Sequence, residues 1–413
     1  MSTNSLIEEL RAWIDKNWDP ELSLSEWRDR LADSGWGAPD WPTDFYGRGL
    51  NPEDAARVMT EFGLSGVVGP ASTGPRLLAG VTLLAHGTPE QKKKYLHGVI
   101  TGRDAWCQLF SEPGSGSDLA GSTTRADRDG DRWIINGQKV WNTSAHHADY
   151  GLLVARTNWD VPKHQGLSYF ILNMHQPGIE VRQLKQMNGH ASFNEVFFTD
   201  AVVERDDLVG EEGQGWGVAL TTLAHERSSF SRMRGGQSVE DRTGRCYDEY
   251  REEVRVDNEP YTWYPQRAGR VDMVVSRAAE TGAINDPVIR QDIAGLLALA
   301  KCAEWYAARG RARPSSQPAA GSINKLAASR IARTAARVHT AISGSGAMLE
   351  GPDSARDGII GEILLSTPAT SIAGGTDEIQ KNIISERILE MPKEPRFDGG
   401  PFKDVPRNAD KRG

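Results

Sequence analysis

The sequence contains little cysteine, with only Cys107, Cys246 and Cys302 in a chain of 413 residues. Three scattered cysteines are too few for a disulfide framework, which favours a reducing compartment such as the cytoplasm. No apolar run approaches the roughly 20 residues that a membrane-spanning helix needs. The first ten residues are polar and acidic, unlike a secretory signal. We therefore expect a cytoplasmic protein without a membrane span.

The chain also has no excess of basic charge. Its 48 Lys and Arg stand against 56 Asp and Glu, which gives a formal net charge of −8. Without a long Lys/Arg run, we expect no nucleic-acid partner. The nine histidines are scattered, and His146 with His147 lacks the spacing of a metal-binding pair, so we expect no metal. Hydrophobic residues, at 38%, suffice for a full core.

Hydrophobic periodicity divides the chain into three zones. Helical spacing dominates residues 1–105, and residues 106–212 alternate with a period of two, which predicts a compact sheet sandwich or barrel. Helical spacing returns over residues 213–392. Within that zone, residues from about 240 to 270 carry many charges and few aliphatics, and we interpret them as a solvated loop. Residues 393–413 are rich in Pro, Gly and charge and predict a loose tail.

Two motifs in the sheet zone are candidates for ligand binding. The first is the Gly- and Ser-rich run Ser111–Asp118, SEPGSGSD, whose backbone N–H groups are suited to phosphate oxygens. It leads into a predicted β-hairpin, so it is not a Rossmann fingerprint, and a plain surface turn remains an alternative. The second is Trp141 with Thr143 at a strand end, where an indole and a hydroxyl could border a flat aromatic cofactor. A strand Trp is more often part of the core.

Two further candidates lie on predicted helices. Over residues 213–233, one apolar stripe contains Trp216, Ala219, Leu220, Leu223 and Phe230. Glu226 and Arg227 project onto this stripe or its edge, where a carboxylate must be paired, protonated or functional. A structural ion pair is one interpretation, and a base that removes a proton from carbon is the other. Near the C-terminus, Ala373–Glu378 opens a last helix and by itself indicates only a well-capped helix start.

In this order, the segments SEPGSGSD, NGQKVWNT, FNEVFF, the Glu226 helix and GGTDEIQKNIISERIL resemble the acyl-CoA dehydrogenase family, from about residue 35 to residue 391. The resemblance implies an α+β multidomain fold with an N-terminal α-helical domain (1–105), a middle β-barrel (106–212), a C-terminal four-helix bundle (213–392) and a tail (393–413). It also implies an FAD cofactor, an acyl-CoA substrate, electron-transfer flavoprotein as electron acceptor, and a homo-oligomer, either dimer or tetramer.

The resemblance also implies roles for individual residues. The positions that match the family's FAD contacts are Gln108, Phe110, Ser111, Gly116, Ser117, Trp141, Thr143, Thr376 and Glu378. Many members carry Gln where this chain has Glu378. Ser117 is also implied as a contact of the acyl-CoA.

The position of the base separates two groups within the family. Many members carry the catalytic Glu where this sequence has Gly374, whereas the long-chain and isovaleryl enzymes carry it on the preceding long helix, just before an Arg. Glu226 matches the second arrangement, with Arg227 and Gly375 on the substrate side and the Gly374 N–H donating to the thioester oxygen. The implied reaction is α,β-desaturation to a trans-2-enoyl-CoA, as in fatty-acid β-oxidation, with the Cα proton passing to Glu226 and hydride passing from Cβ to flavin N5.

Two departures from the family pattern leave alternatives open. The Arg-x-x-Phe-Gly segment of many members has no equivalent after Phe230, and their Gln-x-x-Gly-Gly-x-Gly turn is altered at residues 340–346. A similar pattern occurs in bacterial relatives that pair two different subunits, some of which act on steroid side chains. One alternative assembly is therefore a hetero-oligomer with a second dehydrogenase-like subunit, in which this chain carries the base. The alternative functions are a flavin oxidase or monooxygenase on the same fold, or a non-catalytic subunit of a hetero-oligomeric dehydrogenase.

Overall fold

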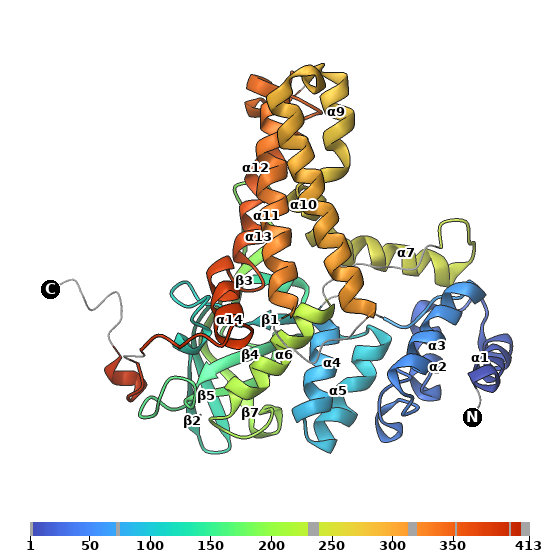
Figure 1. The fold of residues 1–413 in the computed structure, drawn as a ribbon. Coiled ribbons are helices and arrows are strands. Elements are labelled where there is room, and N and C mark those ends of the chain that lie inside the picture. The colour runs from blue at the N-terminus through green and yellow to red at the C-terminus, as the bar shows by residue number, and fades with distance from the viewer. Residues whose placement is uncertain are drawn as a thin grey trace. The chain divides into compact units, whose positions relative to one another are not determined.

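The computed structural model describes residues 3–71, 75–229, 239–312, 320–351, 353–395 and 398–405 (Figure 1). The chain divides into two compact units. The first unit consists of residues 1–184, 191–260 and 397–413, and the second consists of residues 185–190 and 261–396. The domain boundaries expected at residues 105, 212 and 392 stay predictions.

The N-terminal part of the first unit is helical, as the sequence predicts. Its helices are α1 (Thr3–Asn17), α2 (Leu24–Ser34), α3 (Pro52–Ser65), α4 (Pro75–His86) and α5 (Pro89–Thr101). The start of α5 shows why the chain becomes helical there. Thr88 and Gln91 form a capping box, and Pro89 occupies the first turn, where its missing N–H costs no hydrogen bond.

One curled sheet, a half-barrel, follows these helices. Its strands are β1 (Trp106–Leu109), β2 (Arg125–Asp129), β3 (Arg132–Thr143), β4 (Tyr150–Arg156), β5 (Leu167–Asn173), β6 (Ile179–Leu184) and β7 (Phe193–Glu204). The order is β1-β4-β2-β3-β7-β6, with β5 paired to β4. Helices α4 and α6 (Gly215–Ser229) lie near the sheet in Figure 1, and Leu83, Tyr169 and Val218 share one core between them.

The charged segment after residue 240 forms a helix, so the predicted solvated loop is wrong. Helix α7 (Arg245–Asn258) packs against α2, and it buries Cys246, Tyr247 and Tyr250 in the core of the N-terminal helices. Tyr247 and Tyr250 lie one and four positions after Cys246, which places all three side chains on one face of the helix. The segment has few aliphatic side chains because this buried face is built mainly from aromatic rings.

The second unit is a helical assembly. It contains α8 (Tyr264–Arg267), α9 (Val274–Glu280), α10 (Pro287–Ala312), α11 (Ala320–Ser343), α12 (Ile359–Ser366), α13 (Pro368–Ile372) and α14 (Asp377–Arg387). The long helices α10 and α11 lie side by side (Figure 1) and bury Leu296, Ala335 and Val338 together. With helices at both ends of the sequence and a curled sheet between them, the predicted fold class is confirmed.

Short 3₁₀ helices complete the secondary structure. They are η1 (Thr43–Phe45), η2 (Leu119–Gly121), η3 (Ala145–His147), η4 (Arg205–Asp207), η5 (Glu259–Tyr261), η6 (Val271–Met273), η7 (Ala283–Asn285), η8 (Gly344–Met348) and η9 (Phe402–Asp404). The last of these belongs to the segment predicted as a loose tail. That prediction is wrong for residues 398–405, because Phe402 is only 4% exposed and its N–H donates to the carbonyl of Val161 at 2.9 Å. Residues 406–413 lie outside the described part of the chain.

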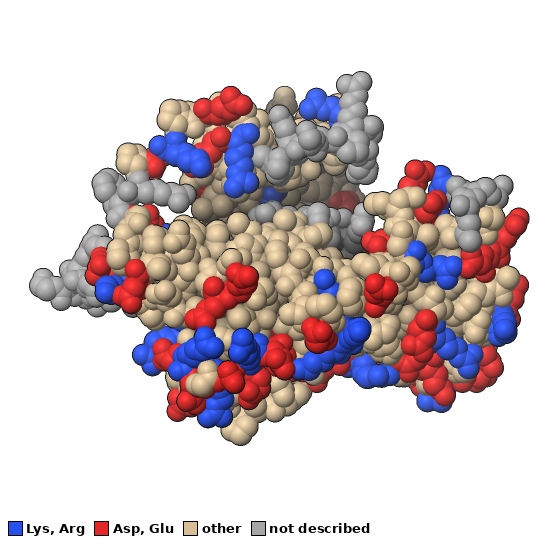
Figure 2. Space-filling model, turned by 90° about the horizontal axis from the view of Figure 1, so that it is seen from below, with Lys and Arg blue, Asp and Glu red and all other residues tan. Residues whose placement is uncertain are grey.

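The surface carries both signs of charge. On the face shown in Figure 2, acidic and basic side chains are interspersed, so that face presents no extended basic stripe of the kind that follows a nucleic-acid backbone. Within the described ranges, no helix has the length and apolar character needed to cross a membrane. Cys107 and Cys246 are buried free thiols, and Cys302 is an exposed one.

The ion pair that fastens α7 yields a stability prediction. The Glu253 carboxylate accepts from the two terminal guanidinium nitrogens of Arg28 at 2.5 Å, and Arg28 is only 2% exposed. Replacing Glu253 by Ala leaves a buried cation without this carboxylate, which should lower the free energy of unfolding by about 3 kcal/mol. Urea denaturation measures the loss. Glu252→Ala is the matched control, because its pair with Arg255 is solvent-exposed and should change little. Equal losses in both variants would contradict a structural role for the buried pair.

Candidate active site

Helix α6 presents Glu226 on its buried side. Gly215, Ala219 and Thr222 are buried and spaced three or four residues apart, and Glu226 continues this series as a half-buried residue. The predicted stripe was therefore wrong at Leu220, which is 42% exposed. Sequence alone placed the stripe by its most apolar side chains, whereas the packed face includes the small and hydroxylated residues that fit closely against α4. Phe230 and the side chain of Arg227 lie outside the described part of the chain.

A cluster of buried hydroxyl groups fixes the rotation of α6. The Oγ1 atoms of Thr82 and Thr222 are 2.8 Å apart, and the hydroxyl of Tyr169 lies 3.1 Å from the Thr222 oxygen. These residues come from α4, α6 and β5, and all three are fully buried. Because an unpaired buried hydroxyl is costly, rotation of α6 would break bonds that water cannot replace. Thr222 lies one turn before Glu226, so the cluster also sets the direction of the carboxylate.

The Glu226 carboxylate lies beside strand β1. The side-chain amide of Gln108 donates to Glu226 Oε2 at 3.5 Å, a long hydrogen bond between partly buried groups. Gln108 is one of the residues predicted to contact a cofactor, and Glu226 is the predicted base. The structure therefore brings together two candidates that lie 118 positions apart in the sequence.

The two predicted cofactor segments of the sheet are also joined. The side-chain amide of Asn142 donates to the Gln108 carbonyl at 2.7 Å, and the Val140 N–H donates to the Ser111 carbonyl at 2.9 Å. Strand β3 therefore runs alongside the end of β1 and the first residue of the SEPGSGSD loop. Gln108, Ser111 and the Trp141–Thr143 segment consequently lie next to one another. We call this part of the sheet side the edge of the candidate site.

A bulge in β3 turns Trp141 out of the sheet. The pairing with β7 shifts register between Val140 and Asn142, and Trp141 adopts a φ of +65°. A left-handed backbone is unusual for a bulky residue and marks a position that the surrounding structure enforces. Trp141 is 58% exposed, with its ring edge against Phe193 at 5.8 Å between centroids. Half-buried Thr143 follows two residues later. The expectation of a plain core Trp is wrong, and the exposed indole suits the edge of a flat ring system.

Behind Trp141, a chain of polar contacts runs through residues that the sequence did not single out for function. Asn194 donates from Nδ2 to the Asn142 carbonyl at 2.7 Å and contacts His146 Nδ1 through Oδ1 at 3.1 Å. An amide oxygen can only accept, so His146 Nδ1 must carry the proton. Burial and the neighbouring His147 lower the pKa of His146, which favours this neutral form. The available sequence signal was Asn194, a polar residue that directly follows Phe193 in the FNEVFF strand.

The SEPGSGSD loop is anchored by an ion pair that the sequence reading also missed. Lys139 is fully buried and donates at 2.9 Å to both Glu112 Oε1 and the Phe110 carbonyl. Glu112 also accepts the backbone N–H groups of Thr123 and Thr124. Burial alone would raise the pKa of Glu112, but the Lys139 charge and these donors outweigh it and lower the pKa to about 2. Burial lowers the pKa of Lys139.

The tip of the same loop leaves polar groups open to solvent. Glu112 and Ser115 exchange backbone hydrogen bonds of 2.9 and 3.0 Å, which closes a tight turn. Gly116 and Ser117 follow it and are exposed, and the space around Gly116 is open. Amide and hydroxyl donors at such a turn suit an anionic group. The Phe110 ring is instead buried against Tyr169, so any ligand contact there falls to its backbone.

The remaining predicted residues lie in the second unit. Thr376 is the N-cap of α14, with its hydroxyl accepting the Ile379 N–H at 3.2 Å, and Glu378 is exposed in the first turn. Gly374 and Gly375 have φ values of +67° and +88°. Glycine occupies this left-handed region without strain, so this turn suits two consecutive glycines.

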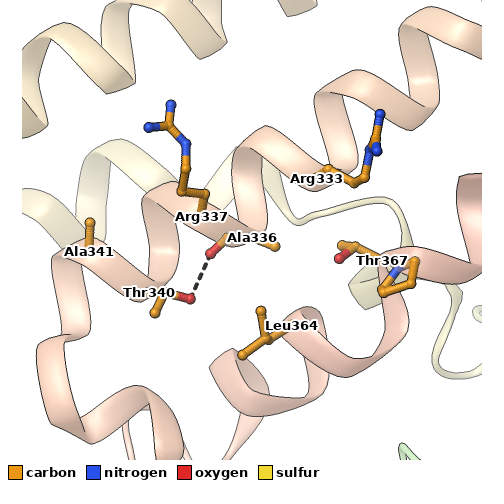
Figure 3. Close-up of a pocket in the computed structure, with 8 residues that line it drawn as sticks. Arg333, Ala336, Arg337, Thr340, Ala341, Leu364 and Thr367 are labelled. Atoms are coloured by element: carbon orange, nitrogen blue, oxygen red, sulfur yellow. Dashed lines mark hydrogen bonds between the residues drawn. The ribbon is translucent and has the colours of Figure 1, made fainter.

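A hollow of about 570 Å³ lies between α11 and the α12–α13 segment of the second unit (Figure 3). Its lining residues are Arg333, Ala336, Arg337, Thr340, Ala341, Leu364, Thr367 and Pro368. No Asp or Glu is among these lining residues, so the hollow contains no carboxylate that could act as a catalytic base. No group of three or more potential metal ligands occurs among the residues that the structure covers.

Three family models match the chain in the order of its parts. They are the acyl-CoA dehydrogenase N-terminal domain at residues 3–103, the middle domain at residues 107–201 and the C-terminal domain at residues 270–389. Fold and matches together define an enzyme of the flavin-dependent oxidoreductase class. The chain belongs to the acyl-CoA dehydrogenase family.

Individual relatives agree with this assignment. Acyl-CoA dehydrogenase IpdE1 of Mycobacterium tuberculosis is 34% identical over 372 residues, which cover 89% of this chain and 88% of the relative. FadE34 of the same organism is 35% identical over 366 residues, which cover 88% of this chain and 46% of the relative. Among solved structures, the Tcur3481-Tcur3483 steroid ACAD has 25% identity and a TM-score of 0.65, with 95% of this chain and 98% of that chain covered. The ChsE4-ChsE5 complex from Mycobacterium tuberculosis has 25% identity, a TM-score of 0.64 and the same coverage.

The pair of Glu112 and Lys139 yields a pH-dependent stability prediction. An unfolded Glu has a pKa near 4.5 and the folded one a pKa of about 2, so its stabilisation is present above about pH 5 and is lost as the pH falls toward 2. Lys139→Met removes the cation and raises the carboxyl pKa, and at neutral pH it should lower the free energy of unfolding by about 3 kcal/mol.

Urea denaturation between about pH 7 and pH 3 tests this prediction, because the gap between wild type and variant should narrow as the pH falls. Lys94→Met is the control, since Lys94 makes an exposed contact with Asp207. A gap that stays constant over this range would show that Glu112 is not the linked group.

Proposed function

We propose that the chain is an FAD-dependent acyl-CoA dehydrogenase that introduces a trans double bond between Cα and Cβ of an acyl-CoA thioester, with Glu226 as the base. The observation that carries the proposal is the half-buried Glu226 carboxylate beside Gln108, at the edge that also presents Trp141. Family membership supplies the class of reaction, and this edge supplies groups suited to a flavin ring and a base.

The residues of this edge fit a flavin. The exposed Trp141 indole offers an apolar border, Thr143 offers a hydroxyl, and the Gly116–Ser117 turn offers donors for phosphate oxygens. We assign FAD binding to these residues together with Gln108, the Phe110 backbone and Ser111, and in the second unit to Thr376 and Glu378. When bound, the flavin supplies the acceptor for the hydride that leaves Cβ.

Glu226 takes the Cα proton in this proposal. A carboxylate that is partly removed from water is a stronger base than a hydrated one, and positioning it on a packed helix fixes its approach to carbon. Arg227, Gly375 and Ser117 are assigned to the substrate side. The backbone N–H of Gly374 donates to the thioester oxygen, where negative charge develops as the proton leaves.

We propose a bulky acyl group, such as a steroid side chain or a ring-bearing acid, in place of a short straight chain. The support is the similarity to the steroid ACAD at 25% identity over 95% of this chain. The low cysteine content supports a cytoplasmic location. Electron-transfer flavoprotein is the proposed electron acceptor.

The proposed assembly contains more than one dehydrogenase-like chain. Two similar solved structures carry paired names, Tcur3481-Tcur3483 and ChsE4-ChsE5, and the second is a complex. We therefore propose a hetero-oligomer in which this chain carries the base, with a homodimer or homotetramer as the alternative. Co-purification from the native host separates the two assemblies.

Replacing the proposed base tests the mechanism directly. Glu226→Gln keeps the size of the side chain but cannot accept the proton, so kcat should fall by about 10³-fold while flavin absorbance per protein stays unchanged. Glu211→Gln is the control, because Glu211 is an exposed carboxylate just before α6. Near-normal turnover in Glu226→Gln would refute the assignment.

A panel of acyl-CoA thioesters tests the substrate and the type of oxidation. Mixed without oxygen, a ring-bearing acyl-CoA should bleach the flavin and raise the melting temperature more than a short straight-chain thioester, because a ligand that binds only the folded state stabilises it. Admission of air should restore the flavin colour slowly. Rapid reoxidation with formation of peroxide would identify an oxidase, and a colourless protein would identify a non-catalytic subunit.

A further inference from the structure

The C-terminal segment 398–405 docks against the loop between β4 and β5. The Phe402 N–H donates to the Val161 carbonyl at 2.9 Å, and the Lys403 N–H donates to the Trp159 carbonyl at 3.0 Å. The rings of Trp159 and Phe402 pack at 5.5 Å between centroids. Two backbone hydrogen bonds and a buried ring hold this segment to the first unit.

Arg156 links the docked segment to residues 120–122, which directly follow the SEPGSGSD loop. Its guanidinium donates to the carbonyls of Ala120 and Ser122 at 2.6 and 3.0 Å, and to the Lys163 carbonyl at 3.1 Å. The Phe402 ring covers the guanidinium, with Cζ 3.6 Å from the ring centroid. Arg156 is fully buried, so the electron-rich face of this ring acts on a cation removed from water, where cation–π attraction is strongest.

Lys163 makes a second link between the docked segment and the loop. Its ammonium group contacts Asp118, the last residue of SEPGSGSD, at 2.8 Å, and Asp398 at 2.5 Å. The Lys163 side chain is largely shielded from solvent, at 13% exposure. One cation therefore bridges a carboxylate of the loop and a carboxylate of the C-terminal segment.

These links place an anchor on each side of the open turn at Gly116 and Ser117. The Glu112–Lys139 pair fixes the start of the loop, and Arg156 with Lys163 fixes its end. The turn between them provides the exposed donors. Loss of either anchor would let the donors sample other positions, which weakens binding because the ligand must then order them.

We propose that residues 398–405 form a strap that holds the SEPGSGSD loop in its ligand-binding conformation, with Phe402 and Asp398 as positioning residues that act through Arg156 and Lys163. The inference rests on the proposed function, which assigns flavin and acyl-CoA contacts to this loop. The strap contacts Arg156, Lys163 and the loop between β4 and β5, so it should govern ligand affinity and leave the chemical step unchanged.

Ring substitutions at Phe402 separate this role from plain packing. Phe402→Leu keeps an apolar side chain but removes the π face, and we expect the flavin Kd and the KM for acyl-CoA to rise about tenfold, with kcat of the flavin-saturated enzyme unchanged. Phe402→Tyr keeps the ring and should restore both values. Lys403→Ala is the control on the same segment, because its side chain pairs with the carboxylate of Asp160 in an exposed ion pair and should leave both values unchanged. The full-length holoenzyme is used throughout.

Hydrogen exchange of the same variants gives a readout that does not need activity. In Phe402→Leu and in the milder Asp398→Asn, amides of residues 113–124 should exchange faster, and those of β7 should keep wild-type rates. If the amides of β7 also exchange faster, or if Leu, Tyr and Phe at position 402 give the same KM and exchange rates, the proposed role of the strap is refuted. If the wild type oxidises no acyl-CoA but loop exchange still depends on Phe402, the proposed function fails and the strap stands.

Discussion

The buried ammonium group of Lys139 is the constraint on which the sheet side of the site depends. A charge without water must be matched by acceptors, and here they are the Glu112 carboxylate and the Phe110 carbonyl. These acceptors lie at the end of β1 and the start of the SEPGSGSD loop. The hydrogen bonds of one ammonium group therefore fix the positions of both segments. Lys139 stands two residues before Trp141, and the same strand therefore carries the loop anchor and the exposed indole.

The helix side of the site depends on hydroxyl groups rather than on charge. Thr82, Thr222 and Tyr169 join α4, α6 and β5 through short contacts in a dry core. Apolar packing alone tolerates small rotations of a helix, whereas a set of directional bonds selects one rotation. Glu226 follows Thr222 by one turn, and so its approach to Gln108 is set by bonds that involve neither residue.

Sequence reasoning succeeded where the signal was local. The strand around Trp141, the SEPGSGSD turn and the placement of Glu226 on a helix face all follow from spacing and residue type within short windows. It failed where partners are distant in sequence. The role of α7 depends on Arg28, more than 200 positions away, and the docking of Phe402 depends on Arg156. Lys139 was passed over because a Lys in a strand usually points to solvent, and only its pairing with Glu112 shows otherwise. The Arg227, Thr376 and Glu378 assignments depend on family resemblance and stay predictions.

The proposed position of the base on α6 has a physical consequence for specificity. Glu226 is held by a helix whose buried face packs on α4 and β5, whereas Gly374 lies in a left-handed turn that favours glycine. A base on a packed helix is positioned accurately but cannot shift without its neighbours. Any change that enlarges the space near the carboxylate through Thr82 or Thr222 also breaks the bonds that direct it. In the proposed mechanism, room for a bulky acyl group must therefore come from other parts of the site, so that the distance between Glu226 and the substrate stays the same while the acyl-binding region varies.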